Sequence, residues 1–426
     1  MKEVLAVFLS AVLAAVALAV PVPHNADNPL AHLVRLYENL RFFELREAVA
    51  GMADNRAVAM EFFRGAVAVA FNRLEPAVEA LRDYLEAAAD LTPRSLTRES
   101  LTLLAEAYSR QGRYGDAARA HRLILERFSA GLDRAHKAHF EDQYNLWSAL
   151  AGTPPQTIEL GNGATIRMTN RYFPARIGDR EYLVGTDTGS NVSVIYESLA
   201  NEQSIPLVGR DIKVQTVTGK TIIGRAGVVR EIRIGPIVVR NVVVLVLPDS
   251  FFRSSSPRTG VERRALLGMP VLAALGELTE TRAGDLIIPA RPAHRSAGNM
   301  CFFGSMPVVE VLHRGTRLSL CLDTGSPTTY LYPPFFRRYR GEIQARSRPR
   351  VSLLHGVGNE RSVEIRILDR FAFETDGRSV AMDKVPVQTV VTHADSRRFF
   401  GTLGTDVLRK CRRMTVNFES MSFILE

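Results

Sequence analysis

The tetrapeptide Asp-Thr-Gly-Ser occurs twice in this chain, each time at the end of an apolar run. The first copy spans residues 187–190 in "VGTDTGSNVSVI", and the second spans residues 323–326 in "LCLDTGSPTTYL". An apolar-apolar-Gly motif, called the Leu-Gly motif below, follows each Asp. Its glycine lies 81 residues after the Asp, at Gly268 in the first case and at Gly404 in the second. Two motifs repeated at identical spacing are not plausibly due to chance. We therefore interpret the C-terminal part of the chain as a duplicated unit.

The sequence around both copies is typical of an all-β fold. Short β-branched runs such as "DIKVQTVTG", "NVVVLVLP" and "RSVEIRIL" alternate with turns that contain Gly, Asn or Asp. A hairpin with a Gly turn precedes each Asp, and a pair of strands follows each Leu-Gly motif, as "GDLIIP" and as "MTVNFESMSFILE". The break "IPARPAHRSAGNM" separates the two copies. The sequence thus predicts two β units, at residues 158–288 and 300–426.

In this doubled pattern the chain resembles the aspartic peptidases over about residues 158–426. Each half looks like the bacterial retropepsin-like group, and two halves in one chain resemble the bilobal, pepsin-like arrangement. The resemblance implies that each half is a small barrel-like β lobe whose Asp loop passes beside the strand of the apolar-Gly motif. It also implies that the two loops meet at a pseudo-twofold axis. The expected fold class is multidomain α + all-β, a helical-hairpin repeat domain followed by a two-lobed aspartic-peptidase β fold.

The chemistry of peptide hydrolysis fits two such loops. The reaction needs an activated water molecule and a proton donor for the amide nitrogen. Two carboxyls about 3 Å apart cannot both ionise easily, so they share one proton, and aspartic proteases are the usual example of this like-charge effect. The resemblance implies this role for Asp187 and Asp323, as an aspartic-type endopeptidase dyad. Such a reaction needs no metal ion or cofactor and forms no covalent intermediate.

The remaining six residues of the two tetrapeptides are expected to support the dyad: Thr188, Gly189, Ser190, Thr324, Gly325 and Ser326. The two glycines lack a side chain, so backbone amides can approach the carboxylates. The two threonines are expected to form hydrogen bonds across the interface between the halves. The two serines are expected to donate hydrogen bonds to the outer carboxylate oxygens.

A pepsin-like enzyme covers its substrate with a β-hairpin flap that carries a tyrosine near its tip. The corresponding stretch here is "VQTVTGKTIIGRAG", which places Thr218 and Gly219 at the predicted tip and contains no tyrosine. The second half has "LLHGVGNERS", with Gly356 and Gly358, so two flaps are expected, as in a symmetric retropepsin dimer. The alternative for each Asp is a turn residue at a strand-to-loop corner. In that case the chain would be a non-catalytic, peptide-binding envelope scaffold with a peptidase-like cleft.

Residues 28–150 are predicted to be helical. The segments "FRGAVAVAFNRLEPAVEALRDYLEAA" and "LTLLAEAYSRQGRYGDAARAHRLILERF" share small and apolar residues at an offset of 40, such as Ala77 and Ala117, and the second is broken at residues 111–113. They resemble tetratricopeptide repeats, which implies an array of helical hairpins that docks a protein substrate or a protein partner. A plain helical bundle that packs only on its neighbour is the alternative.

The N-terminus indicates export. Lys2 precedes an apolar run over residues 4–20, and Ala17 and Ala19 form a small-x-small cleavage site. Residues 1–19 are therefore predicted to be a secretory signal peptide, with an uncleaved membrane anchor as the alternative. The arginine- and alanine-rich composition together with the signal suggests a Gram-negative bacterium, hence the periplasm.

Other residues exclude some functions and leave one question open. The formal net charge is +9, but the basic residues are scattered and match no nucleic-acid motif, so no nucleic-acid partner is expected. Cys301, Cys321 and Cys411 fit no zinc spacing and could be buried thiols or contain one disulfide. Because both Asp motifs lie in one chain, oligomerisation is not required for catalysis.

Overall fold

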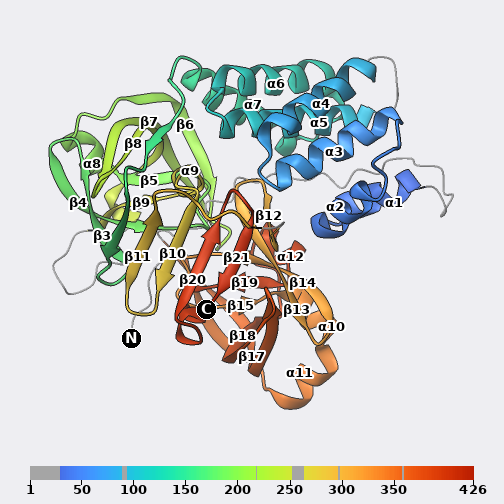
Figure 1. The fold of residues 1–426 in the computed structure, drawn as a ribbon, viewed down its shortest axis with the longest axis vertical. Coiled ribbons are helices and arrows are strands. Elements are labelled where there is room, and N and C mark those ends of the chain that lie inside the picture. The colour runs from blue at the N-terminus through green and yellow to red at the C-terminus, as the bar shows by residue number, and fades with distance from the viewer. Residues whose placement is uncertain (1–28, 89–93, 217, 252–262, 296–297, 357–358) are drawn as a thin grey trace.

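The computed structural model describes residues 29–88, 94–216, 218–251, 263–295, 298–356 and 359–426 (Figure 1). The predicted signal peptide at residues 1–19 and the predicted flap residue Gly358 lie outside these ranges. None of the helices in the described ranges is long and apolar enough to cross a membrane. The described chain consists of an N-terminal helical region followed by a β-rich region from Thr157 onward.

The helical region is built from antiparallel pairs joined by short turns. Each of the first three pairs turns through a residue with positive φ: Leu40 at 56°, Asn72 at 58° and Gly112 at 72°. Gly112 lies in the break predicted at residues 111–113, and this break is confirmed. The helices are α1 (Pro29–Glu38), α2 (Phe42–Ala50), α3 (Val58–Ala70), α4 (Leu74–Ala87), α5 (Arg94–Arg110), α6 (Tyr114–Phe128) and α7 (Arg134–Leu150).

Small residues allow the helices of a pair to approach closely. A Cβ added to Gly65 of α3 would lie 2.5 Å from Cγ of Leu81 on α4, so a larger residue there would push the helices apart. Ala77 on α4 and Ala117 on α6, the two alanines related by the offset of 40, are both completely buried. Phe62 is also completely buried, and its replacement by alanine would cost about 3–5 kcal/mol of stability.

The two β halves have corresponding eight-stranded sheets in the described residues. Their strand orders are β1-β8-β5-β9-β4-β3-β7-β6 and β12-β13-β14-β19-β15-β18-β17-β16. The first contains β1 (Thr157–Glu159), β3 (Tyr172–Ile177), β4 (Arg180–Thr186), β5 (Ser193–Tyr196), β6 (Leu207–Gln215), β7 (Thr221–Ile234), β8 (Ile237–Leu247) and β9 (Arg263–Leu267). The second contains β12 (Met300–Phe303), β13 (Met306–His313), β14 (Thr316–Leu322), β15 (Tyr330–Leu331), β16 (Arg350–Gly356), β17 (Asn359–Thr375), β18 (Arg378–Gln388) and β19 (Gly401–Leu403).

The correspondence is closest around the Asp loops. In each half a hairpin leads into the Asp, formed by β3 and β4 in the first and by β13 and β14 in the second. The second strand of each hairpin then pairs in parallel with the strand of the Leu-Gly motif, β4 with β9 and β14 with β19.

Five short helices lie among the described strands: α8 (Glu197–Glu202), α9 (Met269–Ala274), α10 (Pro333–Arg338), α11 (Arg340–Arg346) and α12 (Ala394–Arg398).

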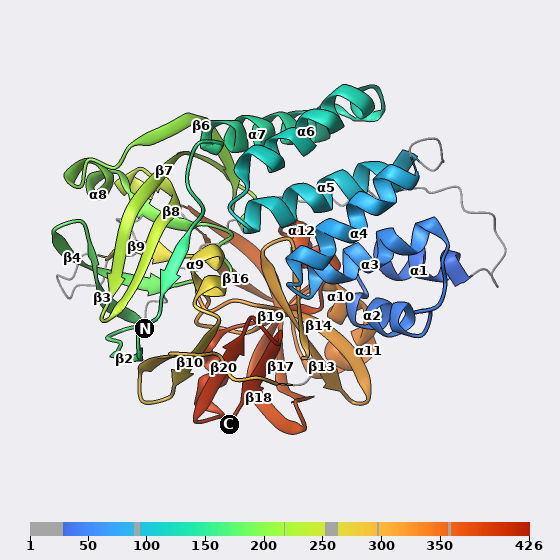
Figure 2. The same cartoon turned by 45° about the horizontal axis from the view of Figure 1, so that its top comes forward.

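A third, five-stranded sheet joins the halves (Figure 2). Its strands are β2 (Gly163–Arg167), β10 (Glu277–Thr281), β11 (Asp285–Pro289), β20 (Arg413–Asn417) and β21 (Ser422–Leu425). The predicted strand pairs that end each half thus exist, but they lie side by side, with β10 antiparallel to β20. Thr279 pairs with Thr415, 136 residues later, and their Oγ1 atoms are 2.7 Å apart. Asp187 and Asp323 have the same separation in sequence, so a local twofold axis relates the halves.

The helical region packs against both β halves. In the first half, α7 contacts β6, where a Cβ added to Gly209 would lie 2.9 Å from Cβ of Ala149. In the second half, the Arg110 guanidinium lies 4.5 Å from the ring centroid of Phe302 on β12, a cation–π contact. Asn72 donates a hydrogen bond of 2.8 Å from Nδ2 to the carbonyl of Phe418. The helices therefore bridge the halves.

Candidate active site

The two Asp loops begin where parallel strands end. Asp187 follows β4 and Asp323 follows β14, and both are buried, with 0% and 1% exposure. The backbone amide of Asp187 donates to the carbonyl of Leu267, and the amide of Asp323 donates to the carbonyl of Leu403, each at 3.0 Å. The Leu-Gly strand of each half therefore fixes the start of the loop that carries the Asp.

The glycines of the Leu-Gly motifs are required for close packing. A Cβ on Gly268 would lie 2.3 Å from the carbonyl oxygen of Val192, and one on Gly404 would lie 2.6 Å from that of Thr328. Both glycines have extended backbone, with φ of −93° and −92°. Their role is therefore steric, because any side chain at these positions would collide with the chain that follows the Asp.

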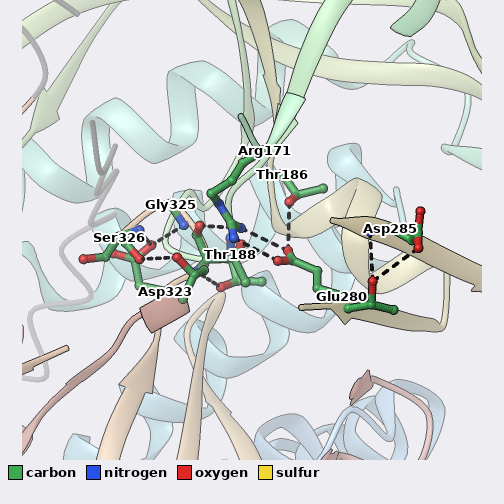
Figure 3. A network of polar contacts seen from close by, with 11 residues as sticks. Arg171, Thr186, Thr188, Glu280, Asp285, Asp323, Gly325 and Ser326 are labelled. Atoms are coloured by element: carbon green, nitrogen blue, oxygen red, sulfur yellow. Dashed lines mark hydrogen bonds and ion pairs between the residues drawn. The ribbon is translucent and has the colours of Figure 1, made fainter. Parts of the chain in front are cut away.

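The two threonines of the tetrapeptides bind each other's loops (Figure 3). The amide of Thr188 donates to Oγ1 of Thr324 at 3.0 Å, and the amide of Thr324 donates to Oγ1 of Thr188 at 2.9 Å. Oγ1 of Thr188 also donates to the carbonyl of Leu322 at 2.8 Å. These buried hydrogen bonds hold the loops in register across the interface, as the sequence predicts.

The two glycines of the tetrapeptides bring the carboxyls together. A Cβ on Gly189 would lie 2.7 Å from Oδ1 of Asp323, and a Cβ on Gly325 would lie 2.6 Å from Oδ1 of Asp187. Each glycine therefore lies against the carboxyl of the other half. In addition, the amide of Gly189 donates to Oδ1 of Asp187 at 2.9 Å, and that of Gly325 donates to Oδ1 of Asp323 at 2.8 Å.

This environment changes the acidity of the pair. Burial raises the pKa of Asp323 to about 6, because removing a carboxylate from water favours its neutral form. A hydrogen bond with the Asp187 carboxyl, the amides of Gly325 and Ser326, and the charge of Arg171 oppose this rise in pKa. The pair therefore retains a proton at mildly acidic pH, where an exposed aspartate would be fully ionised.

The predicted role of the serine hydroxyls is wrong. Oγ of Ser190 donates to the carbonyl of Val192 at 2.7 Å, and Oγ of Ser326 donates to the carbonyl of Thr328 at 2.8 Å. The chain turns back directly after each tetrapeptide, so a carbonyl two residues ahead lies within reach of each hydroxyl. In the second loop a backbone group of the same serine contacts the carboxyl instead, since the amide of Ser326 donates to Oδ1 of Asp323 at 3.1 Å.

The predicted flap residues lie at the turn between β6 and β7. The amide of Gly219 donates to the carbonyl of Thr216 at 2.8 Å, and Gly219 has a φ of 82°, which favours glycine. Thr218 is buried, and its carbonyl accepts a hydrogen bond of 3.4 Å from Nη1 of Arg361 on β17. A second hairpin is formed by β16 and β17, with Gly356 paired to Asn359. The tip of the first hairpin therefore contacts the second hairpin.

Sequence reasoning missed an ion pair beside the dyad. Arg171, in the turn between β2 and β3, binds Glu280 on β10, with Nη1 and Oε2 at 3.0 Å (Figure 3). Nη2 of Arg171 donates to the carbonyl of Thr324 at 2.9 Å. The two residues are 109 positions apart and lie outside the repeated motifs. The signal available in the sequence was Glu280, a charged residue within the short segment that forms β10.

The three cysteines and the possible metal ligands are the remaining candidates for cross-linking or ligand binding. All three cysteines are buried free thiols. Within the described ranges, no group of three His, Cys, Asp or Glu side chains is arranged to hold a metal ion.

Comparison with known families agrees with the first half of the site. A family model described as "Aspartyl protease" matches residues 173–271, which include Asp187 and Gly268. The β-rich region therefore contains an aspartic-protease-like domain, which indicates a hydrolase of the protease class. A comparison of the chain with curated proteins gives no significant match. The matched segment ends before the second Asp-Thr-Gly-Ser, so the part played by Asp323 depends on the geometry given above.

Proposed function

We propose that the protein is an aspartic endopeptidase in which Asp187 and Asp323 activate a water molecule. The observation that carries this proposal is the crossed packing of Gly189 and Gly325 against the opposite carboxyls. The ionised carboxyl accepts a proton as the water oxygen bonds to the peptide carbonyl carbon, and the protonated carboxyl donates to the carbonyl oxygen. As the carbon–nitrogen bond breaks, the proton taken from water passes to the leaving amine. A hydroxyl of the tetrahedral intermediate returns its proton to the other carboxylate as the product carboxyl forms, so the dyad returns to its starting state.

The proposal includes a two-lobed arrangement with the substrate bound between the lobes. The lobes are residues 158–288 and 300–426, and the β6–β7 and β16–β17 hairpins act as flaps. Two apolar side chains on these hairpins support this role, since Ile223 is 53% exposed and Val351 is 77% exposed. Exposed apolar groups of this kind are suited to contact with substrate side chains. One chain carries both carboxyls, so a monomer suffices.

We further propose that the helical region is a tetratricopeptide-like docking domain for a protein substrate or partner. Its helix pairs with left-handed turns support this proposal, and so does the contact of α7 with the first hairpin strand β6. A groove of about 340 Å³ between α4 and the turn before α6 is lined by four carboxylates and two arginines, Arg82 and Arg113, so its net negative charge would suit a basic segment of a partner. We propose export to the periplasm on the basis of the N-terminal sequence alone.

The test is a digest of a peptide library by the full chain between pH 3 and pH 7, with and without a statine-type inhibitor. We expect cleavage that the inhibitor blocks and that Asp187→Asn reduces by at least about a hundredfold. Asp249→Asn is the matched control, because Asp249 accepts a hydrogen bond of 2.8 Å from Ser198 outside the Asp loops. Peptide binding without cleavage would overturn the proposal and identify a non-catalytic peptide-binding scaffold.

A further inference from the structure

The ion pair beside the dyad breaks the symmetry of the two halves. Residues related by the local axis are 136 positions apart, and the positions that correspond to Arg171 and Glu280 hold Pro307 and Val416. The pairing of β10 with β20 supports this correspondence, because Thr279 and Thr415 face each other at the axis. The second half therefore has no charged residue at either equivalent position.

The geometry connects this ion pair to both Asp loops. Glu280 is 3% exposed, and both of its oxygens contact the Arg171 guanidinium, Oε2 with Nη1 at 3.0 Å and Oε1 with Nη2 at 3.1 Å. Oε1 also accepts a hydrogen bond of 3.4 Å from Oγ1 of Thr186, which precedes the first catalytic Asp. Nη2 of Arg171 donates at 2.9 Å to the carbonyl of Thr324, which follows the second catalytic Asp. Figure 3 shows Arg171 between Glu280 and the second loop.

We infer that Arg171 is a positioning residue that holds the second Asp loop through the Thr324 carbonyl and makes the two carboxyls of the dyad electrostatically unequal. Glu280 in turn orients the guanidinium and offsets its charge. The expected effects on kcat and KM rest on the proposed peptidase function. The positioning of the loop and the unequal acidity of the two carboxyls do not depend on it. Two contacts to one carboxylate and a hydrogen bond to the Thr324 carbonyl restrain the guanidinium plane, which a lysine ammonium could not reproduce.

The groups around Asp323 show why the charge matters. Asp187 faces it from the first loop, and the second half contributes Cys321 on β14 and Tyr332, each of which also feels the charge of Asp395 on α12. Burial raises the pKa of the Cys321 thiol and that of the Tyr332 phenol, so both groups are neutral in the pH range of interest.

The two members of the ion pair act on Asp323 in opposite directions. The positive charge of Arg171 lowers the pKa of Asp323 and so opposes the effect of burial. Its removal leaves the Glu280 carboxylate uncompensated, which adds to the rise in pKa. Removal of the Glu280 charge leaves the guanidinium unopposed and lowers the pKa of Asp323. A purely structural role for the pair would not produce effects of opposite sign.

The experiment compares Arg171→Met, Glu280→Gln and Arg171→Lys by the pH dependence of kcat and kcat/KM on a cleaved peptide. We expect Arg171→Met to move the basic limb of kcat/KM, where the protonated carboxyl ionises, to higher pH, and Glu280→Gln to move it to lower pH, each by about half a pH unit or more. Arg171→Lys keeps the charge, so its limb stays near that of the wild type. Its kcat falls by about tenfold with little change in KM, because the Thr324 carbonyl loses its planar donor.

A control with the same chemistry lies in the second half. Arg314 has a φ of 52° and binds Glu342 through two contacts, of 2.6 Å and 2.9 Å. It lies in the turn before β14, whose seven residues span roughly 23 Å before Asp323 is reached. Arg314→Met therefore removes the same charge and the same kind of ion pair, and we expect it to leave both limbs of the pH profile unchanged.

A second readout does not need cleavage. Carbon-13 NMR of labelled aspartate carboxyls in the full chain, assigned with Asp323→Asn, follows the titration of the pair directly. A wild-type chain that cleaves no peptide would overturn the proposed function, yet opposite shifts of the titration in Arg171→Met and Glu280→Gln would still support the inference. Shifts of the same sign, or no shift in either variant, would overturn it.

Discussion

The two β halves are alike where the sequence repeats and differ where other side chains reach the dyad. Both halves fix the amide of the Asp on a Leu-Gly strand at 3.0 Å and place a glycine against the opposite carboxyl. The first half alone contributes the Arg171–Glu280 ion pair, because Pro307 and Val416 occupy the equivalent positions. The duplication thus supplies a symmetric frame for two carboxyls. The inequality of the carboxyls comes from residues that the repeat does not encode.

The halves also differ in their contacts with the helical region. The first half is contacted on β6, a strand of its flap-like hairpin, whereas the second half is contacted through Phe302 and Phe418. A protein bound to the helices would therefore be linked to the flap-like hairpin of the first half and to other strands of the second half.

The largest expected effect tests whether the halves contribute equally to catalysis. The family match covers only the first half, but Asp323 is as buried as Asp187 and shares its environment. We therefore expect Asp323→Asn to reduce kcat by at least about a hundredfold, as much as Asp187→Asn, with an unchanged circular dichroism spectrum. Substantial cleavage by Asp323→Asn would show that the second half serves as a scaffold.

Alanine in place of the loop glycines should have the next largest effect. A Cβ on Gly189 or on Gly325 would lie 2.7 Å or 2.6 Å from an oxygen of the opposite Asp, closer than real contacts allow. Each variant must separate the carboxyls, so we expect kcat to fall by about a hundredfold in both. Steady-state kinetics on one peptide measures this. Near-wild-type kcat in either variant would contradict the crossed packing.

Replacement of Thr188 and of Thr324 should lower the free energy of unfolding by different amounts in the two halves. Oγ1 of Thr188 accepts from the amide of Thr324 and donates to the carbonyl of Leu322, whereas Oγ1 of Thr324 accepts from the amide of Thr188. Valine at either position leaves a buried amide without its acceptor, at a cost of about 1–3 kcal/mol. We expect Thr188→Val to lower the free energy of unfolding more than Thr324→Val. Urea denaturation measures both, and the opposite order would contradict the hydrogen-bond assignment.

The pH dependence of stability should show the smallest effect. Burial raises the folded-state pKa of Asp323 to about 6 from the ordinary value of 3.8, so the folded chain binds the proton more tightly than the unfolded chain. Its stabilising contribution is complete below about pH 4 and is lost as the pH rises through about 6. We expect Asp323→Asn to be more stable relative to the wild type at pH 7 than at pH 4. A difference in Tm that does not change with pH would refute this assignment.

The sequence predicts the symmetric part of the site well. Asp187, Asp323 and the flanking threonines and glycines belong to a repeated motif, so their meeting follows from the repeat itself. The hairpin tip at Gly219 and the helix break at Gly112 are predicted from local backbone preferences. Both rest on short-range rules that a single sequence contains.

The features that the sequence did not predict depend on long-range geometry. The hydroxyl of Ser326 donates to a carbonyl in its own turn, which depends on where the chain folds back. The pairing of Arg171 with Glu280 depends on β2 and β10 flanking the same strand, β11, in one sheet. The joining of β10 to β20 likewise depends on how the two halves pack together. Neither composition nor periodicity carries this information.

A crystal structure of the full chain with a statine-type inhibitor would test the central claim most directly. The account predicts that the hydroxyl of the inhibitor lies within about 3 Å of carboxyl oxygens of both Asp187 and Asp323. An inhibitor bound away from the two loops, or carboxyls too far apart to contact one hydroxyl, would contradict it.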